Sequence, residues 1–326
     1  MEIWQLKQMQ SLDLEIKIKK TKLRIKEWLN YWNDMAYLSF SGGKDSTVLM
    51  HLVKSINEKI PIVFCNTGIQ FPEVKDFVYS FIKNKTEKRV VIKYGYKQEY
   101  YIKDNFIVLH PKYNFKKVIK KYGYPVVSKE QAQYINLYKN TNSKYMKRRV
   151  IFGDEKNRYK ISKKWKYLLN APFKISDKCC KIMKIRPFIR YEKESKRVPF
   201  IGTLVGESSF RLNSFIRTKG CNSFNAKRPM SKPLSFWTEQ DILRYIKIYN
   251  LRYSKIYGEI IQGSDRTLKT TGRNRTGCIF CAFGAHLEEK PNRFQRMKHS
   301  HPKLYKYCIR DLGMSDVLKY INVPYK

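Results

Sequence analysis

The six residues Ser41-Gly-Gly-Lys-Asp-Ser46 place two hydroxyls, a lysine and an aspartate around a pair of glycines. The apolar residues 37–40 precede them and a helical pattern follows, so they form a turn between a strand and a helix. The first N–H groups of a helix have no partner within it, and Lys44 and the hydroxyls add further donors. Gly42 and Gly43 let the backbone approach an anion closely. The turn predicts a phosphate-binding site, although its glycines and lysine do not have the spacing of a Walker A loop. The alternative is a glycine turn that binds no ligand.

Cysteine is the second residue type that could do chemistry in this chain. Cys278-Ile-Phe-Cys281 follows a glycine, which lets two thiolates aim at one metal ion, although two buried cysteines are the alternative. Cys179 and Cys180 are adjacent in the sequence. Cysteines in a chain without signs of secretion favour metal or redox chemistry over structural disulfides. Three further cysteines stand alone, namely Cys65, Cys221 and Cys308.

Other strand ends should lie beside the first turn. Residues 60–65 are typical of a buried strand that ends in Asn66-Thr-Gly68, and residues 71–73 then begin a helix. Strand, helix and strand at this spacing form a parallel βαβ unit. Ligands of open α/β sheets bind beyond the carboxyl ends of the strands, so both turns should face one crevice. Residues 198–211 repeat the order of strand, glycine turn and helix start.

These elements predict an α/β fold, with an open, mostly parallel sheet flanked by helices. Apolar residues at helical spacing predict a basic amphipathic helix over roughly 12–33, and residues 90–94 are a third strand candidate. Ser128 and Thr238 are typical N-caps of two later helices. We divide the chain into an N-terminal helix (1–34), an α/β domain (35–250) with a basic insertion (about 101–178), and a Cys-containing C-terminal region (251–326).

The charge of the chain points to a polyanionic partner. The formal net charge is +40, and residues 101–200 alone hold 27 Lys and Arg against 7 Asp and Glu. Such a charge attracts DNA or tRNA, but the composition of an AT-rich genome is an equal alternative. For residues 139–170 the alternatives are a solvated insertion and a groove in which Tyr and Trp stack on bases. No apolar stretch is long enough to span a membrane and no signal peptide is seen, so we predict a cytoplasmic protein.

The Ser41–Ser46 turn resembles the pyrophosphate loop (PP-loop) of ATP pyrophosphatases and phosphoadenosine phosphosulfate (PAPS) reductases. The phrase that begins at Asn66, and Glu207-Ser208 with Arg211 after a glycine turn, resemble further segments of the same family. The resemblance implies a Rossmann-like, adenine nucleotide α-hydrolase-like fold in which Lys44 and Asp45 take part in catalysis. The nucleotide-binding residues that it implies are Ser39, Ser41, Gly42, Gly43, Lys44, Asp45, Ser46, Asn66, Thr67, Gly68, Gly206, Glu207, Ser208 and Arg211.

The paired cysteines resemble those of adenosine phosphosulfate (APS) reductases, in which adjacent cysteines join a distant C-x2-C to hold a [4Fe-4S] cluster. The resemblance implies a metal site made by Cys179, Cys180, Cys278 and Cys281. The side chains of successive residues diverge, so adjacent cysteines suit a wide cluster better than one tetrahedral Zn²⁺ ion. A zinc site and the absence of any metal are the two alternatives.

Three functions stay open at this point. The first is reduction of APS or PAPS, but the family's C-terminal Glu-Cys-Gly-x-His phrase is missing and Cys308 is the nearest spare thiol. The second is cleavage of ATP by a PP-loop enzyme that adenylates DNA or tRNA for sulfur insertion, as in phosphorothioation or thiolation. The third is a nucleotide-sensing regulator without turnover. Mg²⁺ is a candidate companion of the nucleotide, and a sulfur donor or reductant protein is a candidate partner.

Overall fold

The computed structural model describes residues 2–83, 86–218 and 220–326, which form two compact units. The first unit comprises Met1–Asn66, Gln70–His110 and Pro187–Thr276. The second comprises Thr67–Ile69, Pro111–Arg186 and Gly277–Lys326. This division differs from the one drawn from the sequence: residues 251–276 pack with the first unit, and most of the basic insertion packs with the C-terminal residues.

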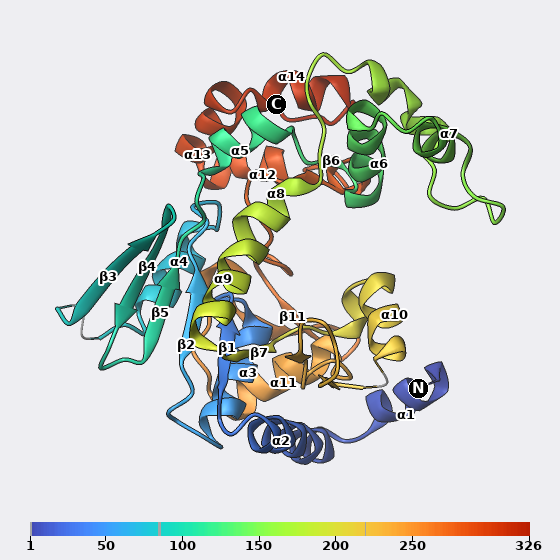
Figure 1. The fold of residues 1–326 in the computed structure, drawn as a ribbon. Coiled ribbons are helices and arrows are strands. Elements are labelled where there is room, and N and C mark those ends of the chain that lie inside the picture. Colours follow the sequence, from blue (N-terminus) through green and yellow to red (C-terminus); the bar gives the residue numbers. More distant parts are fainter. Residues whose placement is uncertain (1, 84–85, 219) are drawn as a thin grey trace. The chain divides into compact units, whose positions relative to one another are not determined.

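An eight-stranded sheet in the order β3-β4-β5-β2-β1-β7-β9-β8 is the centre of the first unit (Figure 1). The five central strands from β5 to β9 are parallel, while β3, β4 and β8 run antiparallel to their neighbours. The predicted α/β fold with a mostly parallel sheet is therefore confirmed. The strands are β1 Ala36–Phe40, β2 Ile62–Cys65, β3 Lys88–Lys93, β4 Tyr96–Tyr101, β5 Phe106–Leu109, β7 Val198–Ile201, β8 Asn222–Ser223 and β9 Met230–Ser231.

Hydrophobic side chains of the central strands point alternately to the two faces of this sheet, so each face has its own part of the core. Leu38 and Phe40 of β1 belong to the larger hydrophobic cluster. Helices α2 (Leu14–Tyr31), α3 (Lys44–Lys54), α4 (Pro72–Tyr79) and α11 (Glu239–Ile248) also contribute residues to this cluster. Tyr37 of β1 and Val63 of β2 belong to a smaller cluster that includes Tyr191 of α9. Successive side chains of a strand point to opposite faces, so both faces of β1 and β2 are buried under helices.

The helices of the first unit begin where the sequence places typical start signals. The predicted N-terminal helix is α2, and Thr238 caps α11 by accepting a hydrogen bond from the backbone N–H of Asp241. The helices are α1 Ile3–Ser11, α2 Leu14–Tyr31, α3 Lys44–Lys54, α4 Pro72–Tyr79, α9 Arg186–Ser195, α10 Ser209–Arg217 and α11 Glu239–Ile248. A hairpin follows α11, made of β10 Ile260–Gln262 and β11 Leu268–Thr270.

The second unit is mostly helical. Ser128 caps α6, as predicted, and accepts a hydrogen bond from the N–H of Gln131. Two short strands, β6 Val126–Val127 and β12 Ala282–Phe283, pair in parallel within it. Its helices are α5 Phe115–Tyr122, α6 Lys129–Asn140, α7 Lys144–Phe152, α8 Lys178–Cys180, α12 Arg293–Ser300, α13 Pro302–Lys306 and α14 Met314–Tyr320.

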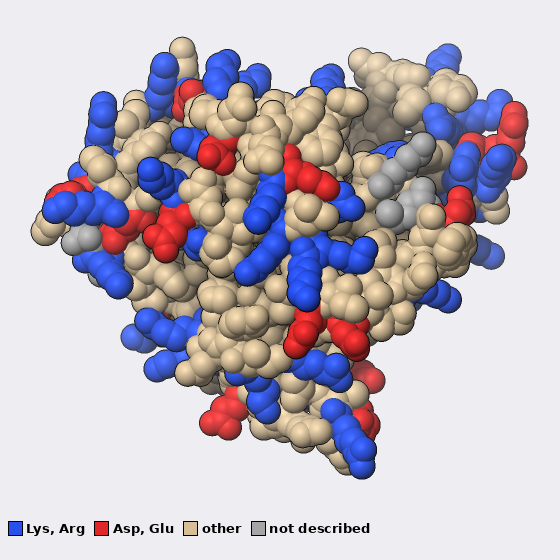
Figure 2. All heavy atoms as spheres, turned by 90° about the horizontal axis from the view of Figure 1, so that it is seen from below, with Lys and Arg blue, Asp and Glu red and all other residues tan. Residues whose placement is uncertain are grey.

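Basic side chains are spread widely over the surface. On the face shown in Figure 2, Lys and Arg occur throughout, and Asp and Glu form small groups among them. Total charge therefore does not by itself locate a binding surface on this face. None of the helices in the described residues combines the length and the apolar character that crossing a membrane requires.

Candidate active site

The Ser41–Ser46 turn joins β1 to α3, as the sequence predicts. The hydroxyl of Ser46 donates to the Gly43 carbonyl oxygen at 2.8 Å, and it lies 3.0 Å from the hydroxyl of Ser41. The backbone N–H of Gly43 donates to the Ser41 hydroxyl at 3.3 Å. The two serines predicted to contact phosphate thus also close the turn on itself. A bound anion would compete with these hydrogen bonds for the same donors, and the bond from Gly43, at 3.3 Å, is the longest of them.

Two glycines are required by close packing around this turn. Gly42 has a φ of +73°, and a Cβ added to it would lie 2.6 Å from the side chain of Val78 in α4. Gly202, which follows β7, comes so close to α3 that an added Cβ would lie 3.0 Å from the Cα of Ser46. A side chain at residue 202 would force the end of β7 or the start of α3 to shift by a few tenths of an ångström.

Lys44 is buried beside two carboxylates. Its ammonium group lies 3.0 Å from Glu239 and 3.6 Å from Asp45, and it donates to the Asn274 carbonyl oxygen at 3.1 Å. Burial alone would lower the pKa of Lys44, but the attraction of Asp45 and Glu239 raises it overall. Burial raises the pKa of Asp45, against the opposing attraction of Lys44. Lys44 thus remains a cation at neutral pH.

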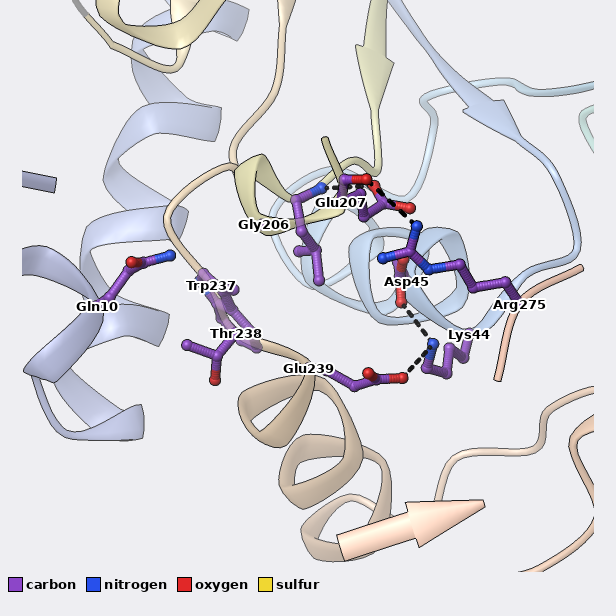
Figure 3. Close-up of a pocket in the computed structure, with 10 residues that line it drawn as sticks. Gln10, Lys44, Asp45, Gly206, Glu207, Trp237, Thr238, Glu239 and Arg275 are labelled. Carbon is purple, nitrogen blue, oxygen red and sulfur yellow. Dashed lines mark hydrogen bonds and ion pairs between the residues drawn. The ribbon is translucent and has the colours of Figure 1, made fainter. Parts of the chain in front are cut away.

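A pocket of about 190 Å³ opens at the start of α3 (Figure 3). Lys44 and Asp45 contribute to its lining together with Gly206 and Glu207, four residues that the sequence assigned to one site. Figure 3 shows Glu239 and Asp45 on either side of the Lys44 ammonium group, and Arg275 directed toward Glu207. Arg275 donates to the backbone oxygen of Glu207 at 3.4 Å. The walls of the pocket therefore combine cations and carboxylates.

Four residues at this site were missed by sequence reasoning. Glu239 and Arg275 line the pocket. The Tyr257 hydroxyl accepts a hydrogen bond from the N–H of Lys44 at 3.2 Å, and Thr276 lies 2.9 Å from the same hydroxyl. The run Arg273-Asn-Arg-Thr276, which precedes the C-x2-C, was a usable signal because two arginines and a hydroxyl cluster there. Nothing in the sequence marked Tyr257 or Glu239.

The remaining predicted nucleotide residues of the first unit have defined places. Ser39 is within β1, and Asn66 follows β2 and donates through its side chain to the Tyr79 hydroxyl at 3.2 Å. Ser208 caps α10 by accepting from the N–H of Arg211 at 3.3 Å. Arg211 forms an ion pair with Glu207, and attraction between Arg211 and Asp45 influences the pKa of both.

The turn after β2 is divided between the units. Thr67 is buried and Gly68 has a φ of +73°, and both are assigned to the second unit. A role of Thr67 and Gly68 in nucleotide binding stays a prediction.

The segment from Tyr124 to Val127 brings both cysteine pairs of the second unit together. Tyr124 pairs with Ile175, four residues before Cys179, and β6 pairs with β12, which begins directly after Cys281. Gly123 permits this arrangement: its φ is +109°, and an added Cβ would lie 2.5 Å from the backbone of Lys174. Residues almost 100 positions apart in the chain thus flank one short strand.

The four thiols are electrostatically linked. A hydrogen bond from Cys179 lowers the pKa of Cys180 to about 6, against burial and with the support of Lys129 and Lys184. Burial raises the pKa of Cys281 to about 11. The proximity of Cys278 raises the pKa of Lys184. Within residues 2–83, 86–218 and 220–326, however, no three Cys, His, Asp or Glu side chains converge as a single metal ion requires.

The other three cysteines of the chain are buried. Cys65, Cys221 and Cys308 are at most 7% exposed, and burial raises the pKa of both Cys221 and Cys308 to about 12. Cys308, the candidate nucleophile, lies in the π-helical turn Tyr307–Asp311 without any exposed surface. The thiolate, not the thiol, is the nucleophile, so this environment does not support the role expected of Cys308.

Taken by itself, the first unit is an open α/β sheet protein with a glycine turn and a cation at the carboxyl end of a central strand. A sequence profile of the phosphoadenosine phosphosulfate reductase domain matches residues 35–282. The chain belongs to this family. Membership supports an enzyme related to nucleotide and sulfur chemistry, without specifying its reaction.

Individual relatives are more distant. The chain is 24% identical over 285 residues to an uncharacterized protein, MJ0973, of Methanocaldococcus jannaschii; the match covers 86% of the chain but only 47% of that relative. The chain thus spans about half the length of this curated relative.

Two solved structures are similar to this chain at 14% identity. One is a PAPS reductase from Candida auris in complex with phosphate (TM-score 0.38, covering 79% of this chain and 98% of that one). The other is the U34-tRNA thiolase NcsA from Methanococcus maripaludis with its [4Fe-4S] cluster (TM-score 0.36, covering 93% and 80%). These likenesses are too weak to bear on the reaction.

Proposed function

We propose that this protein is a PP-loop enzyme of sulfur metabolism that binds ATP at Ser41–Ser46 and cleaves it between the α- and β-phosphorus atoms. The observation that carries this proposal is the turn itself, which bears the Lys44 ammonium group and the hydroxyls of Ser41 and Ser46 at the start of a helix. Reduction of a sulfonucleotide needs a nucleophilic sulfur, and all three cysteines outside the four-cysteine group are buried. Adenylation needs no protein thiol at this step.

An oxygen of the acceptor attacks the α-phosphorus, the bond between that phosphorus and the bridging oxygen breaks, and pyrophosphate leaves with the electron pair. Lys44, the Ser41 and Ser46 hydroxyls and the N–H groups at the start of α3 would stabilise the charge on the phosphates. Mg²⁺ would accompany the nucleotide. A sulfur donor would then displace AMP from the adenylated acceptor.

The four cysteines of the second unit fit a [4Fe-4S] cluster better than one Zn²⁺. Cys179 and Cys180 are adjacent, so their side chains diverge and suit a wide cluster better than one tetrahedral ion. Lys129 and Lys184 lie near the thiols. Cys179, Cys180, Cys278 and Cys281 would hold the cluster, which would supply redox-active iron. Lys129 and Lys184 would stabilise the thiolates.

Reduction of APS or PAPS is the second candidate, and the APS-reductase-like cysteine phrases favour it. In this chain it would require a thiol from a reductant protein, which would attack the sulfur of the nucleotide and release AMP or its 3'-phosphate. A nucleotide-sensing regulator would bind the same ligands without turnover.

Calorimetric titration of anaerobically purified protein with ATP, APS and PAPS separates these functions. The proposal expects ATP to bind at least about tenfold more tightly than either sulfonucleotide, which is about 1.4 kcal/mol. Tighter binding of PAPS or APS, lost in a Lys44→Ala variant, would favour the reductase instead.

A further inference from the structure

Helix α7, Lys144–Phe152, carries an exposed stripe of aromatic and basic side chains in the second unit. Tyr145 and Phe152 are 69% and 68% exposed, which places them among the most exposed aromatic side chains of the described residues. Arg148 lies between them at helical spacing and is exposed too, so the three share one face of the helix. Lys144 is exposed one turn before Arg148, and Lys147 is exposed farther round the same helix. We call these five residues the α7 stripe.

Few acidic groups oppose the charge around the stripe. Residues 139–167 contain 11 Lys and Arg against 2 Asp and Glu. One of the two acids, Asp154, is already paired with Arg158 at 2.9 Å. The local field is therefore strongly positive over the whole segment, not at a single residue.

Other aromatic residues of the segment are already engaged. The guanidinium groups of Arg149 and Arg158 lie 4.8 and 5.5 Å from the centre of the Tyr159 ring. Trp165 is only 8% exposed, so the expectation that a tryptophan here stacks on bases is wrong for this residue. Tyr145 and Phe152 are thus the most exposed aromatic rings of the segment, ahead of Tyr159 and Tyr167 at 45% and 39%.

We propose that the α7 stripe binds single-stranded nucleic acid, with unpaired bases stacked on Tyr145 and Phe152 and phosphates held by Lys144, Lys147 and Arg148. Exposed rings between cations match a strand whose bases and phosphates alternate. A duplex hides the faces of its bases, so it would use the cations but not the rings. Compositional drift explains abundant lysine, but not two exposed aromatic residues flanking an arginine.

If the proposed function is correct, single-stranded nucleic acid is the acceptor that the enzyme adenylates. Only this role as acceptor rests on the proposed function. Binding itself is independent of ATP. It is measured by fluorescence anisotropy with labelled single strands of DNA and RNA and a DNA duplex, each about 20 nucleotides long, without nucleotide. We expect at least one of the two single strands to bind at least about tenfold more tightly than the duplex at about 50 mM salt. Comparison of the DNA strand with the RNA strand shows which of the two nucleic acids the protein prefers.

Two variants separate stacking from charge. Tyr145→Ala with Phe152→Ala should weaken single-strand binding at least about tenfold and leave the salt dependence unchanged. Lys144→Gln, Lys147→Gln and Arg148→Gln together should lower the log-log salt slope by about 2, for three phosphates. The control for charge is Lys298→Gln with Lys303→Gln and Lys306→Gln, three exposed lysines of α12 and α13. The control for exposed rings is Trp4→Ala with Tyr94→Ala.

Several outcomes would overturn the proposal. They are absence of binding at about 50 mM salt, a duplex bound as tightly as the single strands, or charge controls that lower the slope as much as the α7 variant. Circular dichroism confirms that each variant is folded. Calorimetry with ATP on the same preparations shows whether the proposed nucleotide function fails separately.

Discussion

The ammonium group of Lys44 lies 3.0 Å from a carboxylate oxygen of Glu239, the first residue of α11. The same cation is proposed to bind the phosphates of ATP, so the two anions compete for it. The side chain of Glu239 is half exposed, whereas that of Lys44 is buried. Glu239 can therefore turn into solvent when a phosphate arrives, while Lys44 stays in place.

Replacement of Glu239 by Gln should strengthen nucleotide binding. The loss of a competing carboxylate near Lys44 is expected to raise ATP affinity by about threefold, the size of a partly exposed ion pair. Calorimetric titration measures it, and thermal unfolding should differ little from that of the unaltered protein. The exposed Glu58→Gln, remote in sequence from the pocket-lining residues, is a control for the change in charge. Weaker ATP binding in Glu239→Gln would show that the carboxylate assists the ligand.

Removal of the donors of the turn should have the opposite effect. Lys44→Ala with Ser46→Ala is expected to weaken ATP binding at least about tenfold, or 1.4 kcal/mol, through loss of charge-assisted hydrogen bonds. Thr47→Ala is a neighbouring control, because its hydroxyl donates to the Gly43 carbonyl at 3.1 Å and is not among the predicted ligands. A folded double variant with unchanged affinity would remove the turn from the proposed site.

Substitution of a cysteine in the four-cysteine group should have a different effect from substitution of Cys308. Anaerobically isolated protein is expected to hold about four irons and four sulfides per chain, and Cys281→Ala should lose them. Cys308→Ala should keep both the cluster and the enzymatic activity, because that thiol is buried and protonated. Iron and sulfide analysis with visible absorption provides the measurement. Stoichiometric zinc without sulfide would keep the site but contradict the assignment of iron.

The sequence predicted the parts of the site that depend on local pattern. The strand, the two glycines and the helix start at Ser41–Ser46 lie within about ten residues, so their local pattern was enough to predict the turn. The cap of α11 at Thr238 was predicted from an equally local signal. The grouping of Cys179 and Cys180 with Cys278 and Cys281 was predicted only through resemblance, because no local rule joins residue 180 to residue 278, and their role as metal ligands stays a prediction. The structure gives the reason, which is the pairing of Tyr124–Val127 with both flanking segments.

Other features depended on contacts distant in sequence. Glu239 reaches Lys44 because α11 packs against α3, and the Tyr257 hydroxyl meets the N–H of Lys44 across 213 positions. Such contacts leave no periodic signal. The domain boundaries also differ, since a unit built from three segments cannot be recognised from composition along the chain.

Glu99 should make stability depend on acid pH. Burial would raise its pKa, but hydrogen bonds from Lys97, Lys88 and Tyr101 lower it to about 2, below the ordinary value of 4.5. The unfolded chain therefore binds the proton more readily, and the stabilisation is complete above pH 4.5 and lost as the pH falls toward 2. Since both lysines are partly exposed, Glu99→Gln should cost about 1 kcal/mol at neutral pH. Urea unfolding at several pH values measures it; a difference that persists unchanged at the lowest pH would contradict this explanation.

The products formed from ATP test the proposed function most directly. ATP labelled at the γ-phosphate is incubated with the anaerobically purified protein, Mg²⁺, a sulfur donor and single-stranded nucleic acid, and the products are separated by chromatography. We predict labelled pyrophosphate in equal amount to AMP, absent in Lys44→Ala with Ser46→Ala. Labelled orthophosphate with ADP, or no turnover of ATP while PAPS or APS yields sulfite with a thiol reductant, would contradict cleavage between the α- and β-phosphorus atoms.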